Sequence, residues 1–253
     1  MALYWLKEGD NSFGRDAGND FALDSPALAP HAGNFHLQRG SVDFQALPDS
    51  GISLDGRPVH RVELRPDTRG APTELRVASL RLGLIERAGR LGIRARDSVS
   101  PQRAGFTGLR YFPDRADWSV DARFEPYAPA RQVTIVNILG MEISMSSPGA
   151  IVFEHGGRAW RLDTLLEEPG DQRLFVMFAD DTSGRETYGA GRFLYIPLPR
   201  DGHVRVDFNR AHNPPCAFTA FATCPLPPPQ NHLKLRIDAG ELKYEHAAAG
   251  GAH

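Results

Sequence analysis

Long hydrophobic runs are absent from this 253-residue sequence, and so is a secretory signal at its start. Residues 1–16 lack both the basic region and the apolar region of a signal peptide. No apolar stretch approaches the roughly 18 residues that a membrane-spanning helix needs. Cysteine is scarce, with only Cys216 and Cys224. We therefore expect a cytoplasmic protein in which both cysteines are reduced thiols rather than a structural disulfide.

An excess of basic charge is also lacking. The formal net charge is −2 at pH 7. Arginine greatly outnumbers lysine, but the arginines alternate with apolar residues instead of forming a block, which is typical of solvent-facing positions on strands. A nucleic-acid partner needs a basic patch. We therefore expect a small-molecule ligand as partner rather than nucleic acid or a membrane, and the sequence leaves formation of a homo-oligomer open.

Several catalytic motifs are missing as well. The chain contains neither Gly-x-Ser-x-Gly nor His-Glu-x-x-His, which excludes two common hydrolase templates. Its glycine-rich stretch GRETYGAGR lacks the Gly-Lys-Ser/Thr ending of a phosphate-binding P-loop. No cofactor is indicated, and the sequence leaves the choice between enzyme and binding protein open.

The patterns that are present favour β-structure. Short alternating or apolar runs recur with turn residues between them, as in ERAGRLGIRARD, at 118–124, and in the pair 151–153 and 159–162 around His155-Gly-Gly. No long amphipathic helix separates them. We therefore predict a mainly β protein, an antiparallel β-barrel or β-sandwich. We expect further strands at 105–112 and 233–237.

The expected domain organisation is simple. We predict an irregular N-terminal arm over residues 1–34, with a short helix near 2–8, then a single β-rich domain over 35–243, and a flexible tail over 244–253. A separate sheet layer in the N-terminal half stays open. Six prolines between 214 and 229 predict a Pro-rich C-terminal loop, because proline fits neither a helix interior nor a central strand.

Residues 174–231 hold the densest set of polar residues between apolar flanks. Leu174–Phe178 is typical of a buried strand, and two aspartates follow it directly. The apolar run 193–198 and the alternating run 203–208 flank an Arg-Asp-Gly turn, which predicts a hairpin. The loops that enter and leave such a hairpin lie at the same end. We therefore predict one ligand-binding site from both loops, with candidates Asp180, Asp181, Glu186, Tyr188, Arg192, Asn209, Asn213 and Cys216.

Each acidic or basic candidate has two interpretations. Asp180 and Asp181 are acid–base or metal-binding carboxylates, or else they cap the turn that follows them. Arg192 clamps an anionic ligand, or it forms a structural ion pair with a carboxylate such as Asp180 or Glu186.

The other candidates are equally divided. Tyr188 donates its hydroxyl to a ligand or fills the mouth of a barrel. Asn209 and Asn213 orient a ligand or cap loop backbone. Cys216 is a buried thiol, or a nucleophile whose pKa is lowered by His212 or an arginine. Because seven residues separate the two cysteines, the spacing is not Cys-x-x-Cys. A metal site built from both cysteines and one histidine is geometrically possible, but we assign no metal ligands.

The same region resembles a known family. DDTSGRETYGAGRFL, DFNRAHNPPCAFTAFATCPLPPPQN and the upstream GFTGLRYFPDRADWSVDARF are similar to the bacterial and archaeal family named domain of unknown function 1684, over about residues 75–240. The resemblance implies that the polar residues form one shared site, and it supplies no catalytic roles.

Two hypotheses about function follow. In the first, the chain has a pocket for a small polar or anionic molecule, as a binding protein or as an enzyme of unassigned reaction. In the second, it is a non-catalytic structural or interaction domain, in which the motif is an ion-paired plug and a Pro-rich clasp.

Overall fold

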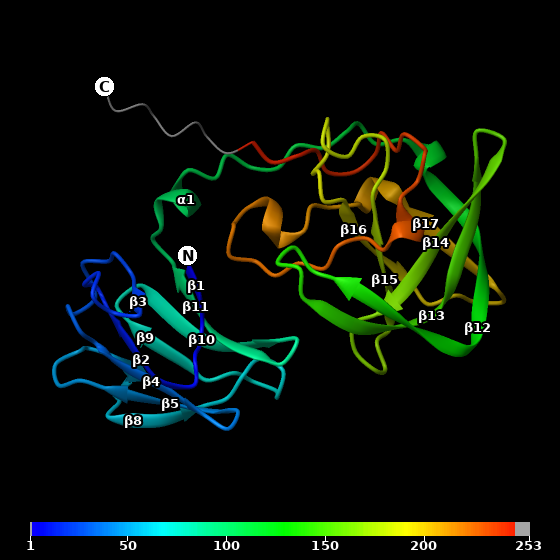
Figure 1. Cartoon of the computed structure of the whole chain (residues 1–253). Helices are drawn as coiled ribbons and strands as arrows, with labels where there is room; N and C mark the ends of the chain where they lie inside the picture. Colours follow the sequence, from blue (N-terminus) through cyan, green and yellow to red (C-terminus); the bar gives the residue numbers. More distant parts are fainter. Residues whose placement is uncertain (1, 246–253) are drawn as a thin grey trace. The chain divides into compact units, whose positions relative to one another are not determined.

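The computed structural model describes residues 2–245, so most of the expected flexible tail lies outside the described residues. The chain is mainly β, as predicted, with antiparallel sheets. It divides into two compact units, Met1–Phe106 and Thr107–His253, which we call unit 1 and unit 2 (Figure 1). This division differs from the single domain expected over 35–243. No helix among the described residues is long and apolar enough to cross a membrane.

Unit 1 consists of two sheets whose side chains share one core. The first has the order β3-β2-β4-β5-β8, and the second has the order β1-β11-β10-β9-β6-β7. Phe35 and Phe44 from the first sheet and Leu75 and Leu82 from the second lie in the same buried cluster. The strands and the single short α-helix are β1 Ala2–Trp5, β2 Gly9–Gly14, β3 Phe21–Ala22, β4 Gly33–Gln38, β5 Ser41–Ala46, β6 Ser53–Leu54, β7 Arg57–Pro58, β8 Arg61–Leu64, β9 Glu74–Val77, β10 Leu80–Arg87, β11 Arg90–Asp97 and α1 Pro101–Ala104.

The first 34 residues are not the irregular arm that we expected. They contain β1, β2 and β3, and the expected helix near 2–8 is replaced by β1, which pairs with β11 from Ala2↔Ala95 to Trp5↔Gly92. An isolated helix of this length is marginal, whereas an edge strand gains a ladder of hydrogen bonds and buries Ala2. The partner strand β11 lies about 90 residues along the chain, so local sequence could not reveal the pairing.

Unit 2 is built on one antiparallel sheet with the order β16-β15-β14-β13-β12-β17. The sheet curls so that its edge strands β16 and β17 approach each other, which makes a nearly closed barrel. Inside it, Phe153, Val176 and Phe208 belong to one buried cluster. The elements are η1 Ala116–Trp118, β12 Ser119–Val136, β13 Glu142–His155, β14 Arg158–Leu166, β15 Arg173–Phe178, β16 Arg192–Pro197, β17 His203–Asp207, η2 Phe208–Arg210, η3 Pro215–Ala217 and η4 Pro229–Asn231.

The β12–β13 hairpin is unusually long, and it bends (Figure 1). Its register shifts between Pro126 and Arg131, which is the signature of a bulge. Beyond the bend, Ile135 packs with Phe175 and Met177 of β15 in a cluster separate from the barrel interior. Both faces of β15 are therefore covered, which explains why 174–178 is a continuous apolar run.

Three local expectations in unit 2 were wrong. The first is the hairpin predicted from residues 193–198 and 203–208. The Asp201–Gly202 turn forms, with φ of 52° and 76°, and Arg200 and His203 exchange hydrogen bonds of 2.8 and 2.9 Å across it. However, β17 continues in register with β12, from Ser119↔Asp207 to Arg123↔His203, rather than with β16. A two-residue turn determines the reversal of the chain but not the strand that each arm finally joins.

The other two wrong expectations are the strands at 105–112 and 233–237. The first segment contributes only a short pairing of residues 110–112 with 240–242. The second runs irregularly across the end of the barrel, and its backbone forms hydrogen bonds with the loop after β15. The backbone of the first segment thus bonds to residues 240–242, and that of the second bonds to residues 179–181, instead of to a neighbouring strand of the sheet.

Candidate functional site

Asp180 lies just beyond the end of β15, with a side chain that is 0% exposed. Its carboxylate accepts hydrogen bonds from the hydroxyls of Thr182 (2.8 and 3.0 Å) and Ser183 (3.2 Å). It also accepts from the backbone N–H of Ile237 at 2.8 Å and from Arg192 Nη2 at 3.3 Å. A carboxylate has about four acceptor positions, so this network leaves none for a ligand.

Arg192 is the partner of Asp180 and is itself completely buried. Its Nη2 donates to Ile237 O at 3.0 Å, and its Nη1 donates to Ala239 O. The guanidinium lies 5.1 Å from the ring centre of Phe178. Burial lowers the pKa of Arg192, and the Asp180 carboxylate opposes that shift. The structural ion pair that the sequence left open is therefore present, and Asp180 is the partner.

Gly191 explains how the arginine reaches this position. Its φ is 87°, and a Cβ atom there would lie 2.6 Å from Phe178 O and 2.7 Å from Pro227 Cγ. Only glycine fits such a close approach without displacing backbone. Together, Asp180, Arg192 and the crossing segment 237–239 form what we call the ion-paired plug.

Glu186 and Asn213 both bind the C-terminal segment 236–243. Glu186 Oε1 pairs with Arg236 Nη1 at 2.8 Å. Asn213 donates its Nδ2 to Glu241 Oε1 at 2.7 Å and to Leu242 O at 2.8 Å. Burial raises the pKa of Glu241. Three buried polar atoms of the candidate residues, namely Glu186 Oε2, Asn213 Oδ1 and Arg192 Nε, have no hydrogen-bond partner among the described residues.

Asn209 caps backbone, one of the two interpretations from the sequence. Its Oδ1 accepts from the N–H of Arg115 at 3.0 Å, and its Nδ2 donates to Arg115 O at 2.9 Å. Asp181 is exposed, and its backbone N–H donates to Leu235 O at 3.0 Å. Both residues thus hold the loops of the barrel end in place through main-chain bonds.

Tyr188, Cys216 and Cys224 form a separate group. The backbone N–H of Cys216 donates to Cys224 Sγ at 3.1 Å, and the Tyr188 hydroxyl donates to Cys216 O at 3.2 Å. Hydrogen bonding from the Cys224 side chain, with help from Tyr188, lowers the pKa of the Cys216 thiol to about 7. Burial raises the pKa of Tyr188. For this effect on Cys216 the sequence suggests His212 or an arginine. His212 instead stacks on Tyr195, with ring centres 5.9 Å apart.

Direct contacts divide the predicted site residues into small groups. The structure brings Asp180 to Arg192 and Tyr188 to Cys216, while Glu186, Asn209 and Asn213 each bind a partner that the sequence did not suggest. Among residues 2–245, no group of three or more His, Cys, Asp or Glu side chains has an arrangement that could hold a metal ion.

Sequence reasoning missed a polar hollow of about 290 Å³ at the bend of β12. We call it the Arg131 hollow, and it is lined by Tyr127, Arg131, Arg161, Asp163 and Gln230. The buried Asp163 accepts from the Tyr127 hydroxyl at 2.7 Å and from Gln230 Nε2 at 2.9 Å. Arg161 donates to the Tyr127 oxygen at 2.9 Å and pairs with Glu125.

Arg131 differs in its contacts from Arg161, the other arginine of the hollow. Its guanidinium lies 3.7 Å from the ring centre of Tyr127. No carboxylate pairs with it within the part of the chain that the structure describes. The prolines at 126 and 129 interrupt the alternation of the strand, which was the one sequence signal of a bend here.

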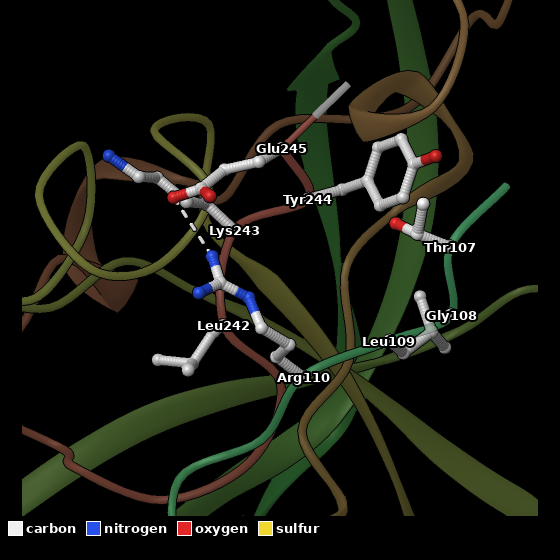
Figure 2. A pocket seen from close by; sticks show the side chains of 8 residues that line it. All are labelled: Thr107, Gly108, Leu109, Arg110, Leu242, Lys243, Tyr244 and Glu245. Atoms are coloured by element: carbon white, nitrogen blue, oxygen red, sulfur yellow. Dashed lines mark ion pairs between the residues drawn. The ribbon is translucent and has the colours of Figure 1, made fainter. Parts of the chain in front are cut away.

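A second hollow, of about 360 Å³, lies where 107–110 runs beside 242–245. Figure 2 shows Arg110 and Glu245 joined across it, and their Nη2–Oε1 distance is 2.8 Å. Leu242 also donates its N–H to Arg110 O at 2.8 Å. The charge of the arginine is thus already paired, and neither of these two hollows is lined by a predicted site residue.

Comparison with known proteins places unit 2 in a family. Residues 104–242 match the family described as "Protein of unknown function (DUF1684)". The chain belongs to this family. The DUF1684 match begins at 104 rather than at 75, where the sequence resemblance was expected to begin, so it coincides with unit 2 and leaves nearly all of unit 1 outside.

Among solved structures, we describe one that is similar to this DUF1684 chain. It is the solution NMR structure of an uncharacterised protein of Haloarcula marismortui, with 28% sequence identity and a TM-score of 0.48. The similarity covers 57% of this chain and 81% of that one. No curated protein matches this sequence.

Proposed function

We propose that unit 2 is a ligand-binding β-domain that takes a small anionic molecule in the Arg131 hollow. The observation that carries the proposal is the state of Arg131, which borders the hollow without a carboxylate partner among the described residues. An arginine that rests one face on an aromatic ring still has its edge free to donate bidentate hydrogen bonds. A carboxylate or phosphate oxygen pair fits that edge.

The charges around the hollow narrow the class of ligand. Arg161 is paired with Glu125, and the Asp163 carboxylate accepts two hydrogen bonds. Two hydrogen bonds leave further acceptor positions on that carboxylate. A ligand that carries only negative groups would be repelled by Asp163. We therefore favour a small carboxylate that also carries a hydroxyl or amino group, with the anionic end on Arg131 and the donor toward Asp163. The volume of about 290 Å³ limits the ligand to a few heavy atoms beyond these groups.

Calorimetric titration with matched ligands and variants tests the proposal. We expect a hydroxy or amino acid to bind more tightly than a plain carboxylate of the same size. Removal of a charged hydrogen bond costs about 1.5–3 kcal/mol, so Arg131→Ala should weaken binding about 10- to 100-fold. The matched control is Arg173→Ala, because Arg173 also stacks on a tyrosine, at 4.1 Å from the ring centre of Tyr195, but lies outside the hollow. Equal affinity in both variants would refute the assignment.

A second candidate function rests on the ion-paired plug. Asp180 and Arg192 are both completely buried, and Asp180 is saturated by bonds from within the chain. In this alternative, the family motif closes the barrel, the Pro-rich segment acts as its clasp, and unit 2 works through a macromolecular partner without a small ligand. Absence of binding to the whole ligand panel by a well-folded wild-type protein would favour it.

A further inference from the structure

Cys216 and Cys224 lie together although neither candidate function uses them. Both are thiols. The Cys224 sulfur is 3.1 Å from the backbone nitrogen of Cys216, and the two thiols lie within hydrogen-bonding range of each other. A disulfide needs the sulfurs to approach to about 2.05 Å. The 3.1 Å contact between Cys216 N and Cys224 Sγ already holds the two residues side by side, so no distant segment has to move to bring them together.

The two cysteines occupy different environments. Cys216 is half-buried, whereas Cys224 is 6% exposed and packs in the cluster of Phe175 and Phe193. An oxidant that arrives from solvent therefore meets Cys216 first. Cys224 stands directly behind it, which is the arrangement of an attacking thiol and a resolving thiol.

The surroundings of Cys216 also favour its thiolate. The titratable side chains that act on this thiol are Cys224, which donates a hydrogen bond to it, and Tyr188, whose hydroxyl lies within hydrogen-bonding range. With a pKa of about 7, roughly half of the Cys216 thiols are ionised at neutral pH. The thiolate is the form that reacts with peroxides.

We propose that Cys216 and Cys224 form a peroxide-responsive dithiol, with Cys216 as the attacking and Cys224 as the resolving residue. The Cys216 thiolate attacks one oxygen of a hydroperoxide, the O–O bond breaks, and an alkoxide or hydroxide leaves. The product is a sulfenic acid on Cys216. The Cys224 thiol then attacks that sulfur, an S–S bond forms, and water leaves with the hydroxyl of the sulfenic acid and the thiol proton. The dithiol loses two electrons and the peroxide gains them.

The proposed disulfide has a structural consequence. It would close the loop 216–224 and tie it to the segment that follows. That segment is bonded to the β12–β13 hairpin, since Ile138 N–H donates to Cys224 O at 3.0 Å and Leu226 N–H donates to Val136 O at 2.9 Å. Oxidation would therefore make the loop 216–224 and the following segment, which pack on the outer face of β15, more rigid.

The first test uses the wild-type protein, so it does not depend on whether a variant folds. Hydrogen peroxide is added in stoichiometric amount, and intact mass and thiol content are followed. We expect loss of both thiols together, a mass decrease of two hydrogen atoms, and no added oxygen. The rate should rise about tenfold between pH 6 and pH 8, because a thiol with a pKa of about 7 is already partly ionised at pH 6. An ordinary thiol of pKa near 8.5 would show a rise of about 75-fold over the same range.

Variants then assign the roles. Cys224→Ser should stop the reaction at the sulfenic acid on Cys216, which a dimedone adduct would reveal by mass, and Cys216→Ser should leave a thiol that reacts as slowly as a buried cysteine. Tyr188→Phe should shift the pH profile upward while the disulfide still forms. Peptide mapping that shows independent oxygen addition at either cysteine of the wild type, or a 75-fold pH dependence, would overturn the proposal.

Discussion

Replacement of Arg192 by alanine tests whether the ion-paired plug holds the barrel closed. The change leaves the buried Asp180 without its cationic partner and removes the donors to two carbonyl oxygens, those of Ile237 and Ala239. Removal of one partner of a buried ion pair costs about 3–5 kcal/mol. A domain of the size of unit 2 loses about 2–4 °C of melting temperature per kcal/mol, so we expect a fall of about 6–20 °C.

The assay must report on unit 2 alone, because two units can unfold separately. Trp5 lies in unit 1, whereas Trp118 and Trp160 lie in unit 2. Urea unfolding of a Trp5→Phe background, followed by tryptophan fluorescence, therefore isolates the unit that contains the plug. Circular dichroism of the same samples would show whether the β-structure is intact before unfolding.

The matched control is Arg236→Ala. Arg236 also pairs with a carboxylate, Glu186, but its side chain is 52% exposed, and such pairs contribute roughly 0.2–1 kcal/mol. If Arg192→Ala unfolds within about 1 kcal/mol of the parent protein, as the control should, the plug is not the structural element that we describe, and its charge would be available for a ligand.

Two further predictions concern the same end of the barrel. Gly191→Ala should destabilise unit 2 by about 2–5 kcal/mol in urea unfolding, because it combines backbone strain at positive φ with overlap of Phe178 O. The control Gly202→Ala, at φ 76° with nothing within 4 Å of its Cβ position, should cost only about 1 kcal/mol. Equal losses of stability in the two variants would refute this distinction. Burial raises the pKa of Glu241, so its contribution to stability is present below its unfolded pKa of about 4.3 and is lost as the pH rises. The unfolding free energy of Glu241→Gln relative to wild type should therefore increase between about pH 4 and pH 7, and a flat difference would contradict the shift.

The strands that depend on local pattern could be predicted from the sequence. The Ala88-Gly89 turn adopts φ of 48° and 74° between β10 and β11, as ERAGRLGIRARD indicated. The Asp180 loop followed local chemistry only in part, because the Asp180 carboxylate accepts from the hydroxyls of Thr182 and Ser183 in its own turn rather than from the backbone that the capping interpretation named. Such features need only a few neighbouring residues, and the sequence supplies them directly.

The pairings between distant segments could not be predicted in this way. Val204 and Val206 alternate equally well whether their strand joins β16 or β12, and the choice depends on closure of the whole sheet. Leu233, Leu235 and Ile237 alternate like the residues of a strand, yet the backbone of their segment forms hydrogen bonds with the loop after β15. Periodicity reports which face is buried, not which neighbour covers it.

The Arg131 hollow was hidden for the same reason. Tyr127 and Arg131 are four residues apart on β12, Arg161 and Asp163 lie on β14, and Gln230 comes from the Pro-rich segment. Only the register shift between Pro126 and Arg131 brings them to one place. A bulge depends on tertiary packing, so no spacing rule in the sequence identifies this group of residues.

Binding of an anion to Arg131 can be followed by a nuclear magnetic resonance titration of the arginine Nε–H groups. Small carboxylates with and without a hydroxyl or amino group, and inorganic phosphate, would be added to the wild-type protein. The Arg131 resonance would be assigned by its loss in Arg131→Lys. We expect a saturable shift of that resonance with a hydroxy or amino acid, and no matching shift at Arg173. If no ligand moves Arg131, or if both arginines shift alike, the hollow is not a binding site.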